Sequence, residues 1–181
     1  MNIFETIRNL FSPQKYERAI SSGETCYKSK NYIEAIQYFE EALAVDPDSH
    51  YAYFMLGSSY SEIHKYEESI PFFMKAISKV SSKRPSYHLA TAKAFQNLAK
   101  HEKAILHYGM SFRKTREDTE VYMNRSECHI VLQQFEKAID DLTSAITINP
   151  VIPEFYVSRG RIFQNLGEYD KAISDKQRLD R

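Results

Sequence analysis

Two cysteines and six histidines are the residues of this chain best able to ligate a metal or to act as nucleophile and base. Cys26 and Cys128 lie far apart and form no Cys-x-x-Cys pair, and no histidine belongs to a His-Glu-x-x-His motif or pairs with a cysteine at zinc-site spacing. The histidines are His50, His64, His88, His101, His107 and His129. We therefore predict no metal site and no disulfide scaffold, and unpaired thiols favour a reducing compartment.

The chain also lacks the short motifs of phosphate binding and acyl transfer. None of Gly-x-x-x-x-Gly-Lys, Gly-x-Gly-x-x-Gly or Gly-x-Ser-x-Gly occurs, and only 5 glycines are present from which such loops could be built. Paired carboxylates such as Glu40–Glu41 and Asp140–Asp141 lie in helical patterns with solvated neighbours. Because activity has to be argued from a site, we predict no enzymatic activity and no cofactor.

The charge balance and the hydropathy pattern argue against two further kinds of partner. Lys+Arg and Asp+Glu are both 24, so the net charge is zero, whereas nucleic-acid-binding proteins usually carry a basic excess. No run of 18 apolar residues occurs, so we expect no membrane span. The N-terminal stretch has charges inside its apolar pattern and no small-residue cleavage site, which is atypical of a signal peptide. We expect a cytoplasmic protein.

The elements that position these residues repeat along the chain. The stretch NYIEAIQYFEEALAVDP, which begins at Asn31, returns later as QFEKAIDDLTSAITINP, and the pattern recurs five times in steps of 34 or 35 residues. The aligned residues are Ala35, Ser69, Ala104, Ala138 and Ala172. Within each step, apolar residues recur at helical spacing in two blocks split by a short polar turn. A fixed period of this size indicates stacked units that share one core.

One repeat shows the pattern best, with YxxLGxxY from Tyr53 followed by SxxxF from Ser69. These residues resemble the tetratricopeptide repeat, and the resemblance covers about residues 16–181. It implies an all-α fold, a right-handed α-solenoid of stacked antiparallel helix pairs. In a repeat numbered from 1 to 34, the small residue that lets two helices approach falls at position 8. The residues at position 8 are Gly23, Gly57, Ala92, Ser126 and Gly160.

The predicted organisation is an N-terminal segment followed by five repeats. Residues 1–15 form a short helix from Asn2 to Phe11 and a linker at Ser12–Pro13. We expect this helix to cap the apolar end of the first repeat, with docking on a membrane surface or in a partner's groove as the alternative. The last helix serves as a polar cap, or the chain belongs to a longer array. The repeats span residues 16–49, 50–83, 85–118, 119–152 and, incompletely, 153–181.

The resemblance implies a groove, lined by the first helix of each repeat, that receives a peptide of a partner protein. The groove residues that we expect to contact the partner are Tyr27, Tyr51, Phe54, Met55, Leu89, Lys93, Met123, Asn124, Glu127 and Arg161. Five of them are expected to be apolar anchors unless neighbouring repeats or the N-terminal helix cover them: Tyr51, Phe54, Met55, Leu89 and Met123. Groove positions hold more Glu than Lys and Arg, so we expect a neutral to basic partner segment.

Two functions are consistent with this pattern. The first is a scaffold or adaptor that binds a partner peptide in the groove. It is not expected to be the kind of co-chaperone that clamps a C-terminal carboxylate with Lys and Asn, because Ile20, Glu24, Met55, Ser86 and Ala90 fill the clamp positions. The alternative is a structural module that forms a homo-oligomer through the solenoid ends or the N-terminal helix.

Two repeat positions change together in the last two repeats. Arg125 and Arg159 stand at position 7, where the second repeat has Leu56. Asp141 and Asp175 stand at position 23, where the earlier repeats have aromatic residues or His. Both positions are expected near the interface between the two helices of a repeat, so we predict the ion pairs Arg125–Asp141 and Arg159–Asp175. The alternative is that each Arg reaches solvent along its stem and each Asp is simply exposed.

Overall fold

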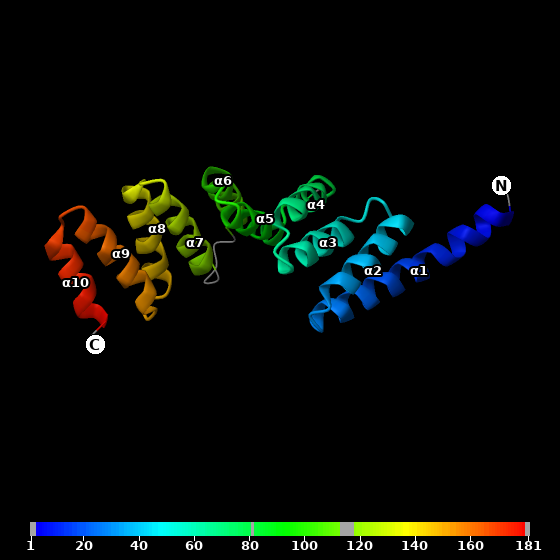
Figure 1. The fold of residues 1–181 in the computed structure, drawn as a ribbon, viewed down its shortest axis with the longest axis horizontal. Coiled ribbons are helices and arrows are strands. Elements are labelled where there is room, and N and C mark those ends of the chain that lie inside the picture. The colour runs from blue at the N-terminus through cyan, green and yellow to red at the C-terminus, as the bar shows by residue number, and fades with distance from the viewer. Residues whose placement is uncertain (1–2, 81, 113–117, 180–181) are drawn as a thin grey trace. The chain divides into compact units, whose positions relative to one another are not determined.

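Helices form all the regular structure of the described chain (Figure 1). The computed structural model describes residues 3–80, 82–112 and 118–179. Within these ranges there are ten helices and no strand, which confirms the all-α class expected from the helical period. The helices are α1 (Ile3–Lys28), α2 (Tyr32–Val45), α3 (His50–Glu62), α4 (Tyr66–Ser78), α5 (Pro85–Asn97), α6 (His101–Ser111), α7 (Asp118–Val131), α8 (Phe135–Ile148), α9 (Pro153–Asn165) and α10 (Tyr169–Leu179).

The helices group into two compact units, residues 1–98 and residues 99–181. The first unit holds α1 to α5, and the second holds α6 to α10. The boundary falls in the turn between α5 and α6, two helices that the sequence pattern assigns to the same repeat, 85–118.

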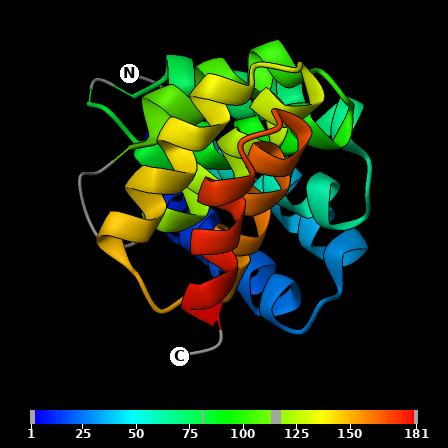
Figure 2. The same cartoon turned by 90° about the vertical axis from the view of Figure 1, so that its left-hand side faces the viewer.

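Neighbouring helices pack in chain order within each unit. In the first unit α1 packs with α2, α2 with α3, α3 with α4 and α4 with α5. In the second unit α6 packs with α7, α7 with α8, α8 with α9 and α9 with α10. In Figure 2 the hairpin of α9 and α10 faces the viewer. Contacts between successive elements are what stacked helix hairpins produce.

Two residues after each first helix of a repeat ends, always at position 15, lies a residue in the left-handed region of backbone space. The φ angles are 61° at Lys30, 60° at His64, 54° at Ala99, 55° at Gln133 and 75° at Gly167. In the first repeat the N–H groups of Lys30 and Asn31 donate to the carbonyls of Tyr27 and Cys26, at 3.0 and 2.8 Å. This pair of hydrogen bonds satisfies the last carbonyls of the helix and turns the chain back.

The core of the first unit depends on aromatic rings that lie against glycines. Phe39 and Phe73 are buried at position 24 of their repeats. A Cβ atom added to Gly23 would lie 2.7 Å from the Phe39 ring, and one added to Gly57 would lie 2.8 Å from the Phe73 ring. The two helices of these repeats can therefore approach each other only because position 8 has no side chain.

The core of the second unit joins its last two repeats. Ala138, Leu142 and Ala145 of α8 form one buried cluster with Phe155 and Ile162 of α9. The first helix of the last repeat thus covers the second helix of the repeat before it. Small and large apolar side chains alternate in this cluster, which lets the facing helices interdigitate.

Helix α1 is longer than the sequence predicted. The expected break at Ser12–Pro13 is wrong, because α1 runs continuously from Ile3 to Lys28 with Pro13 inside it. Proline fixes φ at about −65°, which suits a helix, so the loss is confined to one backbone hydrogen bond and local crowding. The side chains of residues 1–12 lie outside the described part of the chain, so their expected role as a cap stays a prediction.

Candidate functional site

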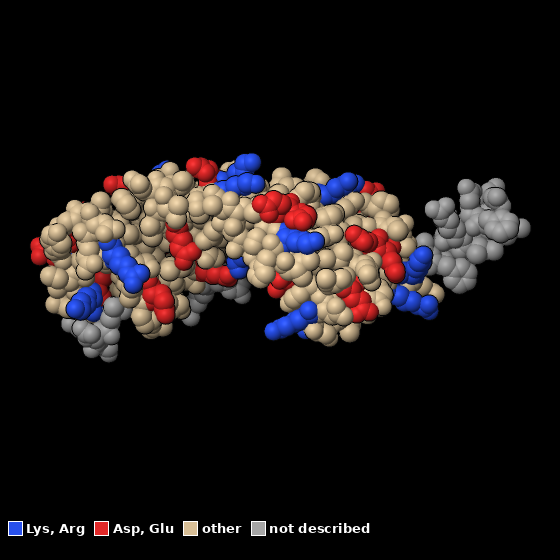
Figure 3. All heavy atoms as spheres, in the orientation of Figure 1, with Lys and Arg blue, Asp and Glu red and all other residues tan. Residues whose placement is uncertain are grey.

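The residues predicted to contact a partner fall into two groups, one on each unit. On the first helices of the first unit, α1, α3 and α5, lie Tyr27, Tyr51, Phe54, Met55, Leu89 and Lys93. On α7 and α9 of the second unit lie Met123, Asn124, Glu127 and Arg161. We call these two surfaces the first-helix face of the first unit and of the second unit. In Figure 3, acidic and basic side chains are interspersed among uncharged ones, and neither sign forms a continuous patch on the side shown.

Two tyrosine–carboxylate hydrogen bonds join α1 to α3 on the first-helix face of the first unit. The Tyr51 hydroxyl donates to Glu24 Oε1 at 2.5 Å, and the Tyr27 hydroxyl donates to Glu62 Oε1 at 3.2 Å. The Tyr27 and Tyr32 rings meet edge to face with centroids 5.3 Å apart. We call Glu24, Tyr27, Tyr32, Tyr51 and Glu62 the tyrosine–carboxylate cluster.

The tyrosine hydroxyls of this cluster keep their protons at any ordinary pH. Burial, together with the neighbouring Glu62 carboxylate, raises the pKa of Tyr27 to about 12. Burial first and then the Glu24 carboxylate also raise the pKa of Tyr51 well above its usual range, and the pKa of Tyr32 is raised for the same kind of reason. The hydroxyls therefore serve as hydrogen-bond donors to the two glutamates.

Phe54 fixes α3 against α5. Its ring stacks on the Tyr87 ring with centroids 4.3 Å apart and an interplanar angle of 14°, and lies 5.8 Å from the Phe73 ring. Met55 is partly buried against the core cluster around Leu56. For these two residues the contacts favour the alternative that neighbouring helices cover them. Phe54 in particular is held by a contact between repeats.

The remaining predicted residues differ in their exposure. Tyr27 and Leu89 are partly buried and Lys93 is exposed. In the second unit, Met123 packs against the cluster of Ala138 and Leu142. Asn124 is partly buried, and Glu127 and Arg161 are exposed. The polar members of the predicted set are therefore more open to a partner than the apolar ones.

Both predicted Arg–Asp ion pairs are present in the second unit. Arg125 Nε and Nη2 lie 2.8 and 2.5 Å from Asp141 Oδ2 and Oδ1. The corresponding distances from Arg159 to Asp175 are 2.9 and 2.6 Å. Each aspartate is 4% exposed, so the alternative of a solvated carboxylate does not hold. Two parallel N–H donors on one carboxylate fix the second helix of each repeat against the first.

Aromatic rings accompany these guanidinium groups. Arg125 lies over the Phe112 ring at 4.7 Å from its centroid. Arg159 Nη1 also donates to Thr143 Oγ1 at 2.9 Å, which connects α9 to α8. These contacts give the two pairs a structural role in the hairpins of the second unit.

His129 lies next to buried Asp141, the partner of Arg125. His129 Nδ1 lies 2.9 Å from Gln134 Oε1, and His129 Nε2 lies 3.9 Å from Asp141 Oδ2. Burial lowers the pKa of His129 below its ordinary 6.5; Arg125 and Lys137 act in the same direction, while Gln134 and Asp141 oppose them. The folded protein therefore holds this ring in its neutral form to a lower pH than the unfolded chain does.

We expect stability to fall as the pH drops below about 6.5. At a pH between the unfolded pKa of His129 and its lower folded pKa, the unfolded chain binds more protons than the folded protein does. The contribution of His129 to the free energy of unfolding is therefore complete above pH 6.5 and is lost on acidification. Replacing His129→Phe, the residue that positions 95 and 163 carry at the same place in their repeats, should flatten this dependence. Thermal melts followed by circular dichroism between pH 7.5 and pH 5 measure it. Burial also lowers the pKa of His88, so part of the pH dependence of stability should remain in the variant. A variant that loses stability as steeply as the parent would contradict the assignment.

The pKa values of both thiols are raised, so the less reactive thiol form is favoured at each. Burial raises the pKa of Cys128 to about 11, and burial and Glu34 raise the pKa of Cys26. Among the described residues, no group of three or more His, Cys, Asp or Glu side chains is placed to hold a metal ion. None of the described helices has both the length and the apolar character that crossing a membrane requires.

Sequence patterns match this architecture over more than half of the chain. Profiles described as "Tetratricopeptide repeat" match residues 19–49, 38–70, 119–152 and 153–175. The matched stretches fall in both units: residues 19–49 and 38–70 run from the later part of α1 to the start of α4, and residues 119–152 and 153–175 run from α7 to the first part of α10.

Several curated proteins are similar to parts of the chain. Hsp70-Hsp90 organizing protein 3 of Arabidopsis thaliana is 33% identical over 82% of this chain and 25% of its own length. DnaJ homolog subfamily C member 7 homolog of Dictyostelium discoideum is 24% identical over 86% of this chain, again 25% of its own length. U-box domain-containing protein 70 of Oryza sativa subsp. japonica is 22% identical over 53% of this chain. The chain thus spans about a quarter or less of the length of these relatives, 12% in the last case.

Solved structures share the fold. A crystal structure of MamA protein superposes with a TM-score of 0.85 at 17% identity, covering 92% of this chain and 90% of that one. The structure titled "YrrB: a TPR protein with an unusual peptide-binding site" gives a TM-score of 0.79 at 16% identity, covering 88% and 82%. The period, the stacked helix hairpins and the matching profiles agree: the chain belongs to the tetratricopeptide repeat family.

Proposed function

We propose that the protein is a non-catalytic scaffold that binds a segment of a partner protein on the first-helix face of its first unit. In this proposal a basic side chain of the partner binds at the tyrosine–carboxylate cluster. The family, the fold and relatives such as the Hsp70-Hsp90 organizing protein support a protein–protein adaptor. The peptide-binding site named in the YrrB title supports a peptide segment as the form of the partner.

The observation that carries this proposal is that two carboxylates are hydrogen-bonded but have no positively charged partner among the described residues. Glu24 and Glu62 each accept a hydrogen bond from a tyrosine hydroxyl, yet within the described residues neither forms an ion pair with Lys or Arg. Hydroxyl donors stabilise a carboxylate without neutralising it, so two negative charges stay on this face. A lysine or arginine side chain would supply the missing positive charge.

The tyrosine rings of the cluster add to the attraction for a cation. The face of a tyrosine ring attracts a cationic group, by roughly 0.5 to 1 kcal/mol at exposed sites. Tyr27 and Tyr32 meet edge to face, and the Tyr27 hydroxyl donates a hydrogen bond to Glu62, so the two rings and this carboxylate lie together. Partly buried Leu89 and exposed Lys93 on α5 would contact flanking parts of the segment. Phe54 would support this face from within.

We expect a double replacement of Glu24→Gln and Glu62→Gln to weaken binding of a basic peptide by roughly three- to tenfold, because two partly exposed charge pairs are lost. Glutamine keeps an oxygen that can accept the tyrosine hydrogen bonds, so the fold should hold. The probe is a fluorescein-labelled decapeptide of alternating Leu and Lys, and its fluorescence anisotropy is measured at 50 and 300 mM salt. Affinity should also fall with salt, since exposed charges are screened.

The matched control places the same charge change on another helix. Glu40 and Glu41 are exposed on α2, and replacing both by Gln should leave the affinity within about twofold of the parent. The affinity of a peptide with Glu in place of Lys should be unchanged by Glu24→Gln and Glu62→Gln, because this peptide does not use the cluster. Equal losses from the two double variants would reject the proposed role of the cluster.

The other predicted contacts stay proposals of the same kind. Met123, Asn124, Glu127 and Arg161 define the first-helix face of the second unit, which we propose as a separate contact surface. The alternative of a homo-oligomer built through the N-terminal segment depends on side chains outside the described residues. The expected cytoplasmic location likewise stays a prediction.

A further inference from the structure

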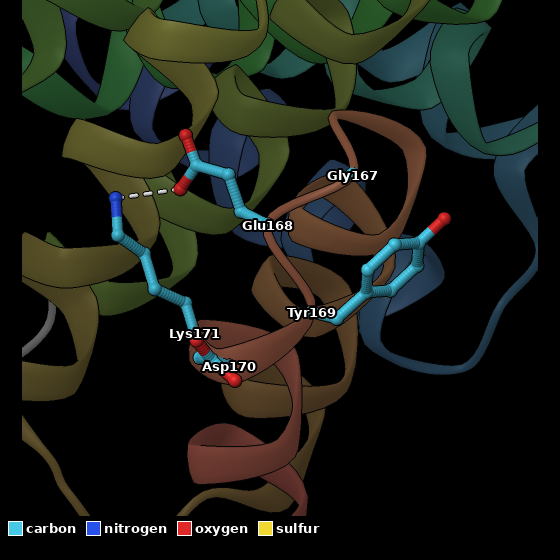
Figure 4. A pocket seen from close by; sticks show the side chains of 5 residues that line it. All are labelled: Gly167, Glu168, Tyr169, Asp170 and Lys171. Carbon is cyan, nitrogen blue, oxygen red and sulfur yellow. Dashed lines mark ion pairs between the residues drawn. The ribbon is translucent and has the colours of Figure 1, made fainter.

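The exposed face of the hairpin α9–α10 differs from the same face of the repeat before it. In that earlier repeat, Phe135 and Ile139 of α8 pack against the buried cluster to which α9 contributes Phe155 and Ile162. The residues at the same repeat positions on α10 are Tyr169 and Ile173, and they are 65% and 54% exposed. Figure 4 shows the Tyr169 ring on the side of the turn opposite to the Lys171–Glu168 ion pair.

A hollow opens beside these residues at the place where earlier repeats hold an aromatic ring. At position 24, Phe39 and Phe73 fill the space over the position-8 glycine of their repeats. In the last repeat, position 24 is Lys176, which is exposed, and a Cβ atom on Gly160 would have no neighbour nearer than 3.7 Å. A cavity of about 350 Å³ lies at the α9–α10 turn, and one of about 280 Å³ lies between the two helices, lined by both Gly160 and Lys176.

The charged residues that line the 280 Å³ cavity between the two helices, which we call the hollow, all have the same sign, whereas Glu168, Asp170 and Lys171 line the cavity at the turn. Arg161 of α9 and Lys176 of α10 line the hollow together with apolar Val157 and Ala172, and no acidic residue does. Within the described residues neither cation takes part in an ion pair. In the preceding repeat the corresponding positions carry Glu127 and Leu142, so that repeat has no basic residue at either position. The hollow therefore combines an apolar floor with two unpaired positive charges.

We propose that the α9–α10 face binds an acidic amphipathic helix of a partner protein. A helical shape for the partner segment is indicated by α9, since this helix covers the equivalent surface of α7–α8. Its chemistry is set by the hollow: an aromatic or leucine side chain enters the space over Gly160, and Asp or Glu side chains on either side of it meet Arg161 and Lys176. Tyr169 and Ile173 pack against the rest of its apolar face. This surface lies on the second unit and is independent of the tyrosine–carboxylate cluster.

The test uses the full chain and two designed 16-residue helical peptides. Both are alanine-based with Phe and Leu at i, i+3, i+4 and i+7; one carries Glu beside the apolar stripe, and the other carries Lys. Binding is measured by fluorescence anisotropy. In a protein that carries Glu24→Gln and Glu62→Gln, which weakens the other site proposed for basic peptides, we expect the Glu peptide to bind and the Lys peptide to bind at least roughly tenfold more weakly, because like charges repel across the interface.

Three variants separate the contributions to binding. Lys176→Glu should weaken the Glu peptide by roughly fivefold or more. Lys176→Phe restores the aromatic residue of the earlier repeats, closes the hollow and should abolish binding while the melting temperature holds or rises. Lys100→Glu, an exposed residue of the same unit, is the matched control and should leave affinity unchanged.

Three outcomes would overturn the proposal. They are equal affinity for the two peptides, no binding of either peptide at millimolar concentration, and an effect of Lys176→Glu no larger than that of Lys100→Glu. Sedimentation equilibrium of the protein alone supplies a further check. A dimer that forms in the parent and is lost on Ile173→Ser would assign the face to a second copy of the chain instead.

Discussion

Replacing Asp141→Ala is expected to lower the free energy of unfolding by about 3 to 5 kcal/mol, the largest effect we predict for a single side chain. Asp141 is buried and accepts two hydrogen bonds from Arg125. Its loss leaves a guanidinium group that is only 23% exposed beside the Phe112 ring, without its counter-charge. Denaturation in guanidinium chloride, followed at 222 nm, measures the change.

The neighbouring carboxylate provides the matched control. Asp140 is exposed, so Asp140→Ala should change stability by less than about 0.5 kcal/mol. If the two alanine variants lose the same stability, the buried pair does not have the importance given to it here. A control on the arginine side is Arg125→Lys, which keeps the charge but cannot donate two parallel hydrogen bonds to one carboxylate.

The second repeat offers a rescue of the lost pair. There the same two positions carry Leu56 and Phe72, which pack in the core of the first unit. The double replacement of Arg125→Leu and Asp141→Phe should therefore recover most of the stability that Asp141→Ala loses, since a well-packed apolar pair often replaces a buried ion pair at little cost. A double variant less stable than Asp141→Ala would show that the pair is tied to further contacts, of which His129 is the nearest candidate.

The second large effect concerns two glycines at the same repeat position, for which we expect opposite signs. Gly57→Ala should destabilise the protein by about 1 to 3 kcal/mol, because the new Cβ would lie 2.8 Å from the buried Phe73 ring and 3.1 Å from the Ser69 carbonyl oxygen. Gly160→Ala meets nothing closer than 3.7 Å and should stabilise by up to about 1 kcal/mol, the gain in helix propensity. Melting temperatures of the two variants decide the matter. A loss of stability in both would mean that the last hairpin is packed more tightly than its hollow indicates.

Much of the fold follows from periodicity in the sequence. The helical spacing of apolar residues and the recurrence of Ala35 and its counterparts predict the helix pairs and their order. The Arg–Asp pairs were predictable for a different reason. Position 7 and position 23 change together within one chain, and a matched change of charge indicates contact. Neither the helix pairs nor the Arg–Asp pairs had to be inferred from the sequence of the turns.

What the sequence could not supply is the packing of side chains between repeats. Phe54 lies at a groove position, but its covering by Tyr87 depends on where α5 packs against α3. The tyrosine–carboxylate cluster was missed although Glu24, Tyr27, Tyr51 and Glu62 all lie at groove positions, because a repeat pattern does not say which hydroxyl reaches which carboxylate. The break expected near Pro13 failed because proline's fixed φ is helical.

The turns give a further example of a feature without a sequence signal. The left-handed residue that follows each first helix is glycine only at Gly167; elsewhere it is Lys, His, Ala or Gln. An L-residue in this conformation costs on the order of 1 to 2 kcal/mol, so the surrounding hydrogen bonds and packing impose it. Residue type at position 15 therefore carries little information about the turn, and the place of the residue in the repeat is what the five turns share.

The boundary between the two compact units has a consequence for how the protein holds together. It passes through the turn after Leu98, inside the third repeat, so α5 completes the core that α3 and α4 begin, and α6 starts the next one with α7. The 34-residue segment that recurs in the sequence is thus different from the segment that packs as one compact unit. A substitution in α5 therefore acts on the core that α5 shares with α3 and α4, and a substitution in α6 acts on the core that α6 shares with α7.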